Sequence, residues 1–231
     1  MLEKIKQTAE FIQNIIQETP DFAIVLGSGL GKLQEEVEAI RTLEYHEIPN
    51  FPQTTVVGHG GKLIYGILEG KKVLMMSGRF HYYEGHSMET VTFPFRVFKL
   101  LGIQNLIVSN ASGGVNPNFR VADIMIIEDH INMMPEHPLR GKNIDELGPR
   151  FVDMSEPYNR KMIAVAEEVA KNLEIKVREH LKIDTGFGRY GFIYTEKEKI
   201  LESLKKLANV KIAGTFILFS IAFFVDGKET Q

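Results

Sequence analysis

The chain has 231 residues, of which 44% are hydrophobic and 25% charged, the composition of a globular protein with a sizeable core. Its formal net charge of -3 gives no general attraction to nucleic acid or to an anionic membrane, so an anion site has to be local. There is no cysteine, which excludes disulfides and thiolate metal sites and favours a cytoplasmic location.

Neither end of the chain has the pattern of a membrane segment. MLEKIKQTAEFIQNII (1–16) mixes charged and apolar residues at helical spacing, lacks the apolar stretch of a signal peptide, and predicts an amphipathic surface helix. IAGTFILFSIAFFV (212–225) carries no charge but is too short to span a bilayer. We expect it to be a buried strand or a core helix.

The first half of the chain alternates strand and helix patterns. FAIVL (22–26) is an apolar run that leads into GSGLG (27–31), and KLQEEVEAI (32–40) then has helical spacing, the order of an α/β unit. KLIYGILEGKKVLMMSG (62–78) predicts a hairpin that turns at Glu69 and Gly70.

A second set of patterns follows. METVTFPFRVFKLLG (88–102) predicts a helix that Gly102 closes and that Pro94 should kink or shorten. NLIVSNASGG (105–114) predicts a strand entering a turn of small residues, and IMIIEDHINMM (124–134) predicts a further strand.

The last patterns are helical. YNRKMIAVAEEVAKNLEI (158–175) and TEKEKILESLKKLA (195–208) have amphipathic spacing, and the second begins with a capping box from Thr195 to Glu198. Alternating strands and helices with one hairpin predict a three-layer α/β/α fold with a mixed central β-sheet.

The GSGLG turn is the first candidate site. Backbone amides between a strand and a helix can hold an anion, and Ser28 adds a hydroxyl donor. The alternative is that this segment is only a tight turn. Lys32 stands where a dinucleotide fingerprint needs its third glycine, so a nicotinamide-dependent oxidoreductase is a poor alternative.

Three further segments carry groups that can hold an anion. His59 lies between glycines, Arg79 and His81 follow an apolar strand, and SNASGG offers backbone amides around Ala111. The guanidinium fork of arginine suits a tetrahedral oxyanion, and Tyr83 can lie over a sugar or an uncharged ring. Each residue alone also fits a simpler role, a surface histidine or an ordinary ion pair. Together they favour inorganic phosphate.

Other chemistry has less support in the sequence. EDHIN and PEHP each bring Glu and His together, but their spacing fits no common metal site, and we expect no metal and no cofactor. The chain has no G-x-S-x-G nucleophile elbow. His86 has no assigned role and is expected to be structural.

The chain contains, in this order, VLGSGLG, IPNFPQTTVVGHGGKL, GRFHYYEGHS, VTFPFRV, IVSNASGGVNP, DHIN, HPLRG and GPRFVDMSEPY. In these motifs it resembles the trimeric purine nucleoside phosphorylases over about residues 1–177. The resemblance implies a nucleoside phosphorylase fold and phosphorolysis of purine nucleosides of the inosine or guanosine type. The products would be a free purine and a (deoxy)ribose 1-phosphate, as in purine salvage.

The resemblance also implies roles for individual residues. Phosphate, a co-substrate, would be held by Ser28, His59, Arg79, His81 and the Ala111 amide, and the ribose by Tyr83. HINMMPEHPL resembles a segment that reaches a neighbouring subunit, so Met133 and Met134 are possible contacts in a homotrimer. No nucleic-acid or membrane partner is implied.

After Val177 the sequence departs from the family motifs. We expect residues 1–177 to form the phosphorylase-like α/β domain and residues 178–231 to be a divergent segment that completes or extends it. The base-side glutamate and asparagine of the family have no counterpart that we can place, and Glu196, Glu198 and Asn209 fit a solvated surface. Activity of this chain is therefore in doubt, and the alternative is a non-catalytic phosphate-binding or interaction protein.

Overall fold

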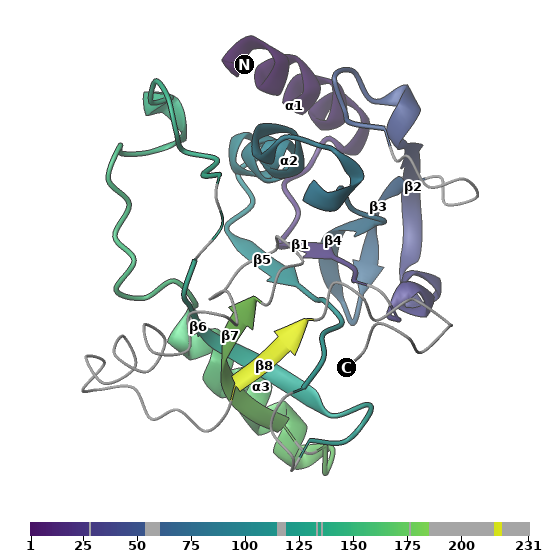
Figure 1. The fold of residues 1–231 in the computed structure, drawn as a ribbon. Helices are drawn as coiled ribbons and strands as arrows, with labels where there is room; N and C mark the ends of the chain where they lie inside the picture. The colour runs from purple at the N-terminus through teal and green to yellow at the C-terminus, as the bar shows by residue number, and fades with distance from the viewer. Residues whose placement is uncertain are drawn as a thin grey trace, which may run out of the picture. The chain divides into compact units, whose positions relative to one another are not determined.

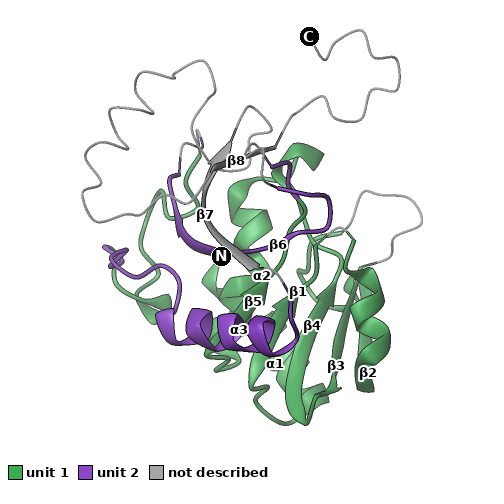
Figure 2. Ribbon diagram, turned by 90° about the horizontal axis from the view of Figure 1, so that it is seen from below, with its two compact units in different colours: residues 1–111, 136–150 green, residues 112–135, 151–231 purple. Residues whose placement is uncertain are grey.

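The computed structural model describes residues 1–27, 29–53, 61–114, 119–132, 134 and 136–175, with the backbone of 177–184 and 215–218. The chain divides into two compact units, coloured separately in Figure 2. The first comprises residues 1–111 and 136–150, and the second comprises residues 112–135 and 151–231. The domain boundary expected at residue 177 stays a prediction.

The first unit is built on a mixed five-stranded sheet (Figure 1). Its spatial order is β2 (Glu38–Glu44), β3 (Lys62–Leu68), β4 (Lys71–Ser77), β1 (Phe22–Val25) and β5 (Asn105–Val108). Strand β1 runs parallel to both β4 and β5, whereas β3 is antiparallel to β2 and β4. The carboxyl ends of β1, β4 and β5 therefore meet at one edge of the sheet.

The β3–β4 hairpin forms where the sequence predicts it. Glu69 and Gly70 have φ values of 49° and 72°, and Leu68 pairs with Lys71 across the turn. Two consecutive left-handed residues twist in the sense of the flanking strands, which is why such turns close tight hairpins. This prediction is confirmed.

The prediction of a helix over residues 32–40 is wrong. The chain forms a short 3-10 helix, η1 (Gly31–Glu36), and then strand β2. A Cβ on Gly66 of β3 would lie 3.0 Å from the Cα of Ala39, so the missing side chain lets β2 approach. Pairing with β3 thus overrides the local helical spacing.

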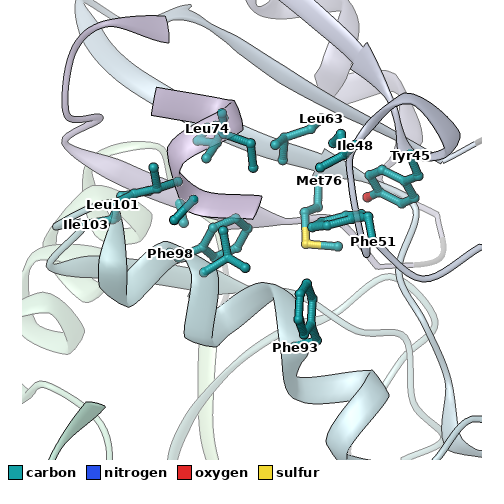
Figure 3. Close-up of a cluster of buried hydrophobic side chains, with 14 of the residues drawn as sticks. Tyr45, Ile48, Phe51, Leu63, Leu74, Met76, Phe93, Phe98, Leu101 and Ile103 are labelled. Atoms are coloured by element: carbon teal, nitrogen blue, oxygen red, sulfur yellow. The ribbon is translucent and has the colours of Figure 1, made fainter. Parts of the chain in front are cut away.

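Two helices cover one face of this sheet, α1 (Leu2–Ile16) and α2 (Met88–Leu100). Figure 3 shows part of this apolar cluster, with Phe93 and Phe98 of α2 near Met76 of β4. The buried cluster contains Ile5, Ile12, Ala23, Val25, Leu63, Leu74, Met76, Phe93, Val97, Phe98 and Leu101. A smaller buried cluster, with Ile24, Val37, Ile64, Val73 and Met75, uses the alternate strand positions, as expected for the opposite face.

Helix α2 is defined by its ends. The Ser87 hydroxyl accepts a hydrogen bond from the backbone N–H of Thr90 at 3.2 Å, which caps the first turn. Gly102 has a φ of 80° and follows the last turn. The helix runs past the buried Pro94 to Leu100, so the proline does not end it.

The second unit has a parallel sheet in the order β6 (Ile124–His130), β7 (Val177–Asp184) and β8 (Thr215–Leu218). Helix α3 (Arg160–Asn172) is capped by Asn159, whose side chain accepts from the backbone N–H of Lys161 and Met162. Strand β8 lies within the apolar run 212–225. The capping box predicted at Thr195 and Glu198 lies outside the described residues.

The described chain confirms the α/β class and the mixed sheet. Among its helices, none is long and apolar enough to cross a bilayer.

Candidate functional site

The candidate site is the edge of the first sheet at which β1, β4 and β5 end. Val25 of β1 is in register with Met76 of β4 on one side and Val108 of β5 on the other. The loops that follow these strands begin at Leu26, Gly78 and Ser109. Loops at the carboxyl ends of parallel strands are where open α/β sheets bind ligands.

Arg79 joins two of these loops. Its Nη1 donates a hydrogen bond to the carbonyl oxygen of Ser109 at 2.8 Å, and its Nε donates to Nε2 of His81 at 3.1 Å. The guanidinium is partly buried. Because two contacts orient its plane, its remaining N–H groups have a defined direction.

His81 is held from the other side by Glu84. The Nδ1 atom forms a hydrogen bond with the Glu84 carboxylate, whose side chain is only 6% exposed. Since Nε2 accepts from Arg79, the proton of the neutral imidazole lies on Nδ1 and is donated to Glu84. Glu84, His81 and Arg79 thus form a continuous chain of hydrogen bonds.

Tyr83 lies against His81. The two rings stack with centroids 4.8 Å apart and an interplanar angle of 25°. Tyr83 is 53% exposed, so its ring keeps a surface that a ligand can contact. The stack places the Tyr83 ring against the imidazole that accepts a hydrogen bond from Arg79.

The glycine turn after β1 is fixed to the loop after β5. The backbone N–H of Gly27 donates to Oγ of Ser109 at 2.9 Å. A Cβ at Gly27 would lie 2.7 Å from the Cα of Asn110, a separation that backbone atoms cannot tolerate. Gly29 has a φ of 90°, which favours glycine there as well.

Tyr45 supports the residue before Arg79. Its hydroxyl donates to the carbonyl oxygen of Gly78 at 2.7 Å, and its backbone N–H donates to the carbonyl oxygen of Gly61 at 2.9 Å. Burial raises the pKa of the Tyr45 phenol well above its usual value, so the phenol stays protonated as a donor. Gly78 has a φ of 101°.

The structure brings together several residues that the sequence analysis selected. Arg79, His81 and Tyr83 form one cluster, and Ala111 lies exposed in the loop after β5 at the same edge. Ser28, His59 and Met133 lie outside the described residues. Met134 is partly buried and belongs to the second unit. The ligand roles of all these residues stay predictions.

His86 lies beside the aromatic cluster, and its expected structural role stays a prediction. Its ring packs edge-on against Phe80 with centroids 5.8 Å apart. Its Nε2 is buried, and within the described part of the chain it has no hydrogen-bond partner.

Sequence reasoning missed Glu84, Ser109 and Tyr45. Glu84 had a signal, since it follows His81 by three residues and the short helix η3 (Tyr82–Glu84) brings the two together. Ser109 and Tyr45 act through contacts between distant segments, and nothing local in the sequence marks them. No group of three or more potential metal ligands occurs among the described residues.

Comparison with known proteins identifies the family. The sequence profile of the Phosphorylase superfamily matches residues 21–200, which extends past the boundary at residue 177. Purine nucleoside phosphorylase 1 of Bacillus subtilis is 50% identical over 179 residues, which cover 78% of this chain and 66% of that protein.

Solved structures agree with this similarity. A crystal structure of a purine nucleoside phosphorylase in complex with ribose 1-phosphate has a TM-score of 0.76 at 43% identity, covering 80% of this chain and 70% of that chain. A schistosoma purine nucleoside phosphorylase in complex with hypoxanthine has a TM-score of 0.77 at 36% identity, covering 93% of this chain and 81% of that chain.

The curated relatives are longer than the matched region. In the first three of them the match covers 66%, 64% and 60% of their length. The identity is nevertheless high, and the profile covers most of the chain. The chain belongs to the phosphorylase superfamily and, within it, to the purine nucleoside phosphorylase family.

Proposed function

We propose that the protein catalyses the phosphorolysis of purine nucleosides to a free purine and (deoxy)ribose 1-phosphate. The observation that carries the proposal is the cluster of Arg79, His81 and Tyr83 at the carboxyl ends of β1, β4 and β5. One similar structure contains ribose 1-phosphate, a sugar-phosphate product of this reaction, and another contains hypoxanthine, a free purine product.

The reaction gives the cluster a physical purpose. Cleavage of the glycosidic bond develops positive charge on the sugar, so a phosphate held beneath it stabilises the oxocarbenium-like transition state and then forms the new bond to C1. The leaving purine gains negative charge and needs a donor or an acid on its side. The described cluster supplies the phosphate and sugar side.

Individual roles follow from this scheme. Arg79 binds phosphate, with the Ala111 amide and, outside the described residues, Ser28 and His59 as further donors, while His81, whose two ring nitrogens contact Arg79 and Glu84, holds Arg79 in place. Arg79 is the strongest of these assignments, because its orientation is set by contacts to Ser109 and His81. Tyr83 lines the ribose, and its exposed ring supports this role.

The test is an assay of hypoxanthine release from inosine at varied phosphate concentration. The wild-type protein should turn over inosine only when phosphate is present, and the Arg79→Ala variant should lose this activity. A folded protein that is stabilised by phosphate but shows no turnover at high enzyme concentration would instead be a non-catalytic phosphate-binding protein. Absence of any phosphate effect contradicts both functions.

We also propose assembly as a homotrimer, with Met133 and Met134 near the neighbouring subunit. The second unit has an exposed apolar run that supports self-association: Phe151 is 89%, Val152 50% and Met154 65% exposed. Light scattering after size-exclusion chromatography should give the mass of three chains, and Phe151→Ser should shift it toward the monomer. A monomeric wild-type protein would rule out this assembly.

In the cell, the proposed reaction belongs to purine salvage. The cytoplasmic location stays a prediction from the absence of cysteine.

A further inference from the structure

Ser109, the first residue after β5, uses all of its polar groups to join neighbouring segments. Its backbone N–H donates to the carbonyl oxygen of Val25 at 3.1 Å. Its Oγ accepts from the backbone N–H of Gly27 at 2.9 Å, and its carbonyl oxygen accepts from Nη1 of Arg79 at 2.8 Å. One serine therefore contacts the loops that follow β1 and β4 while it begins the loop after β5.

The contact with Gly27 is close as well as polar. Gly27 is buried, and a Cβ there would be 2.7 Å from the Cα of Asn110. The start of the glycine turn is thus pressed against the backbone of residues 109–110. Its N–H has no room to turn to water and depends on the Ser109 hydroxyl for an acceptor.

These contacts lead to a role in ligand binding. Donors that bind one small anion from separate loops must be held at fixed distances, because a small displacement weakens several hydrogen bonds together. We propose that Ser109 is a positioning residue of the phosphate site: its hydroxyl fixes the glycine turn beside the backbone carbonyl that orients Arg79. This inference rests on the proposed function, since it assumes that Arg79 binds phosphate.

A purely structural role is the competing explanation, and the chain offers a matched control for it. Asn105 lies at the other end of β5, where its Nδ2 donates to the carbonyl oxygen of Asp21, just before β1, at 3.0 Å. Asn105→Ala therefore removes a side-chain hydrogen bond between the same two strands, far along the strand from Arg79 and Gly27. Asn105→Ala should lower the stability of the fold without changing its affinity for phosphate.

The experiment compares Ser109→Ala, Ser109→Thr and Asn105→Ala with the full-length wild-type chain. Phosphate affinity is measured by calorimetry with inorganic phosphate, KM for phosphate and for inosine by the hypoxanthine assay, and stability by thermal unfolding. Ser109→Ala should weaken phosphate binding about tenfold, or about 1.4 kcal/mol, and raise KM for phosphate by the same factor. KM for inosine should change less than about twofold, a change of about 0.4 kcal/mol.

Rescue and control complete the test. Ser109→Thr keeps a hydroxyl and should bind phosphate within about threefold of wild type, a difference of about 0.6 kcal/mol. If Ser109→Ala does not fold, Ser109→Cys replaces it, because sulfur is a weaker acceptor of similar size, and it should also weaken phosphate binding.

The outcomes separate the two claims. Wild-type phosphate affinity in Ser109→Ala, or equal loss of affinity in Asn105→Ala, overturns the positioning role while leaving the proposed function intact. A failure of Ser109→Thr to restore affinity also counts against it. A wild-type protein that binds no phosphate overturns the proposed function itself, and the role of Ser109 with it.

Discussion

The Tyr45 hydroxyl donates a hydrogen bond to the carbonyl oxygen of Gly78 at 2.7 Å, one residue before Arg79. Tyr45 is 2% exposed and packs its ring against Phe51 and Phe80, with centroids 4.9 and 5.3 Å away. The end of β4 is therefore held by a buried aromatic residue that lies on a different segment of the chain. This arrangement connects the apolar core to the anion site.

Tyr45→Phe should lower both stability and phosphate affinity. The carbonyl oxygen of Gly78 would lose a buried donor, which costs about 1–2 kcal/mol, and the melting temperature should fall by roughly 2–8 °C for a chain of this size. Differential scanning calorimetry with and without phosphate measures both effects.

Tyr65→Phe is the control for this change. The Tyr65 hydroxyl donates to Oε2 of Glu18 at 3.3 Å. When this hydroxyl is removed, Glu18 still has its ion pair with Lys72. The control should leave phosphate affinity unchanged. Equal loss of affinity in both variants would show that the Gly78 contact has no special effect on the site.

Glu84→Gln should weaken phosphate binding by about tenfold. The amide oxygen can still accept from Nδ1 of His81, but a neutral acceptor is weaker than a carboxylate by about 1–1.5 kcal/mol. His81 would then orient Arg79 less strictly. Isothermal titration with phosphate measures the change.

Glu89→Gln tests whether the effect of Glu84 comes from its position or from its charge. Glu89 is an exposed carboxylate in the first turn of α2, five residues further along the chain. It should bind phosphate like the wild type. A comparable loss in this variant would mean that general electrostatics, and not the contact with His81, sets the affinity.

Gly27→Ala should be strongly unfavourable compared with Gly31→Ala. At Gly27 a methyl group would lie 2.7 Å from the Cα of Asn110, whereas at Gly31 it has nothing within 4 Å. Overpacking against backbone costs about 1–3 kcal/mol, and an unhindered Gly to Ala change is close to neutral or stabilising by about 0.4–1 kcal/mol. Urea unfolding of both variants provides the comparison; equal midpoints would contradict the close approach of the two loops.

The Glu18–Lys72 ion pair should give a small, pH-dependent contribution to stability. A hydrogen bond and the charge of Lys72 lower the pKa of Glu18 below its usual value, and the same contacts with Glu18 raise the pKa of Lys72. At pH values above the pKa that Glu18 has in the unfolded chain, its charge stabilises the fold. This contribution is lost as the pH falls through the lowered pKa that Glu18 has in the folded chain. At pH values below the pKa that Lys72 has in the unfolded chain, its charge stabilises the fold. This contribution is lost as the pH rises through the raised pKa that Lys72 has in the folded chain.

Lys72→Met isolates this contribution. The melting temperature of the variant should be slightly below wild type at neutral pH, and the two should converge in acid, where Glu18 is protonated. Salt should reduce the difference because both side chains are about half exposed. A difference that persists below the lowered pKa of Glu18 would point to lost packing of the lysine stem instead.

Much of the fold could be predicted because its signals are local. The hairpin needed only two strand runs and the turn at Glu69 and Gly70, and α2 needed apolar spacing and the glycine at residue 102. The wrong helix at residues 32–40 shows the limit, since β2 exists through pairing with β3 at a place where Gly66 has no side chain.

The sequence by itself determined the α/β class, the strand-end positions of Arg79 and His81, and the family motifs. These depend on periodicity, turn residues and residue identity, which neighbours in the chain express. Only the tertiary structure decided that Ser109 accepts hydrogen bonds from both Gly27 and Arg79, that Glu84 and Arg79 bind opposite nitrogens of His81, and that Tyr45 holds Gly78. Most of these contacts join residues 30 or more positions apart, which only the pairing and order of the strands bring together.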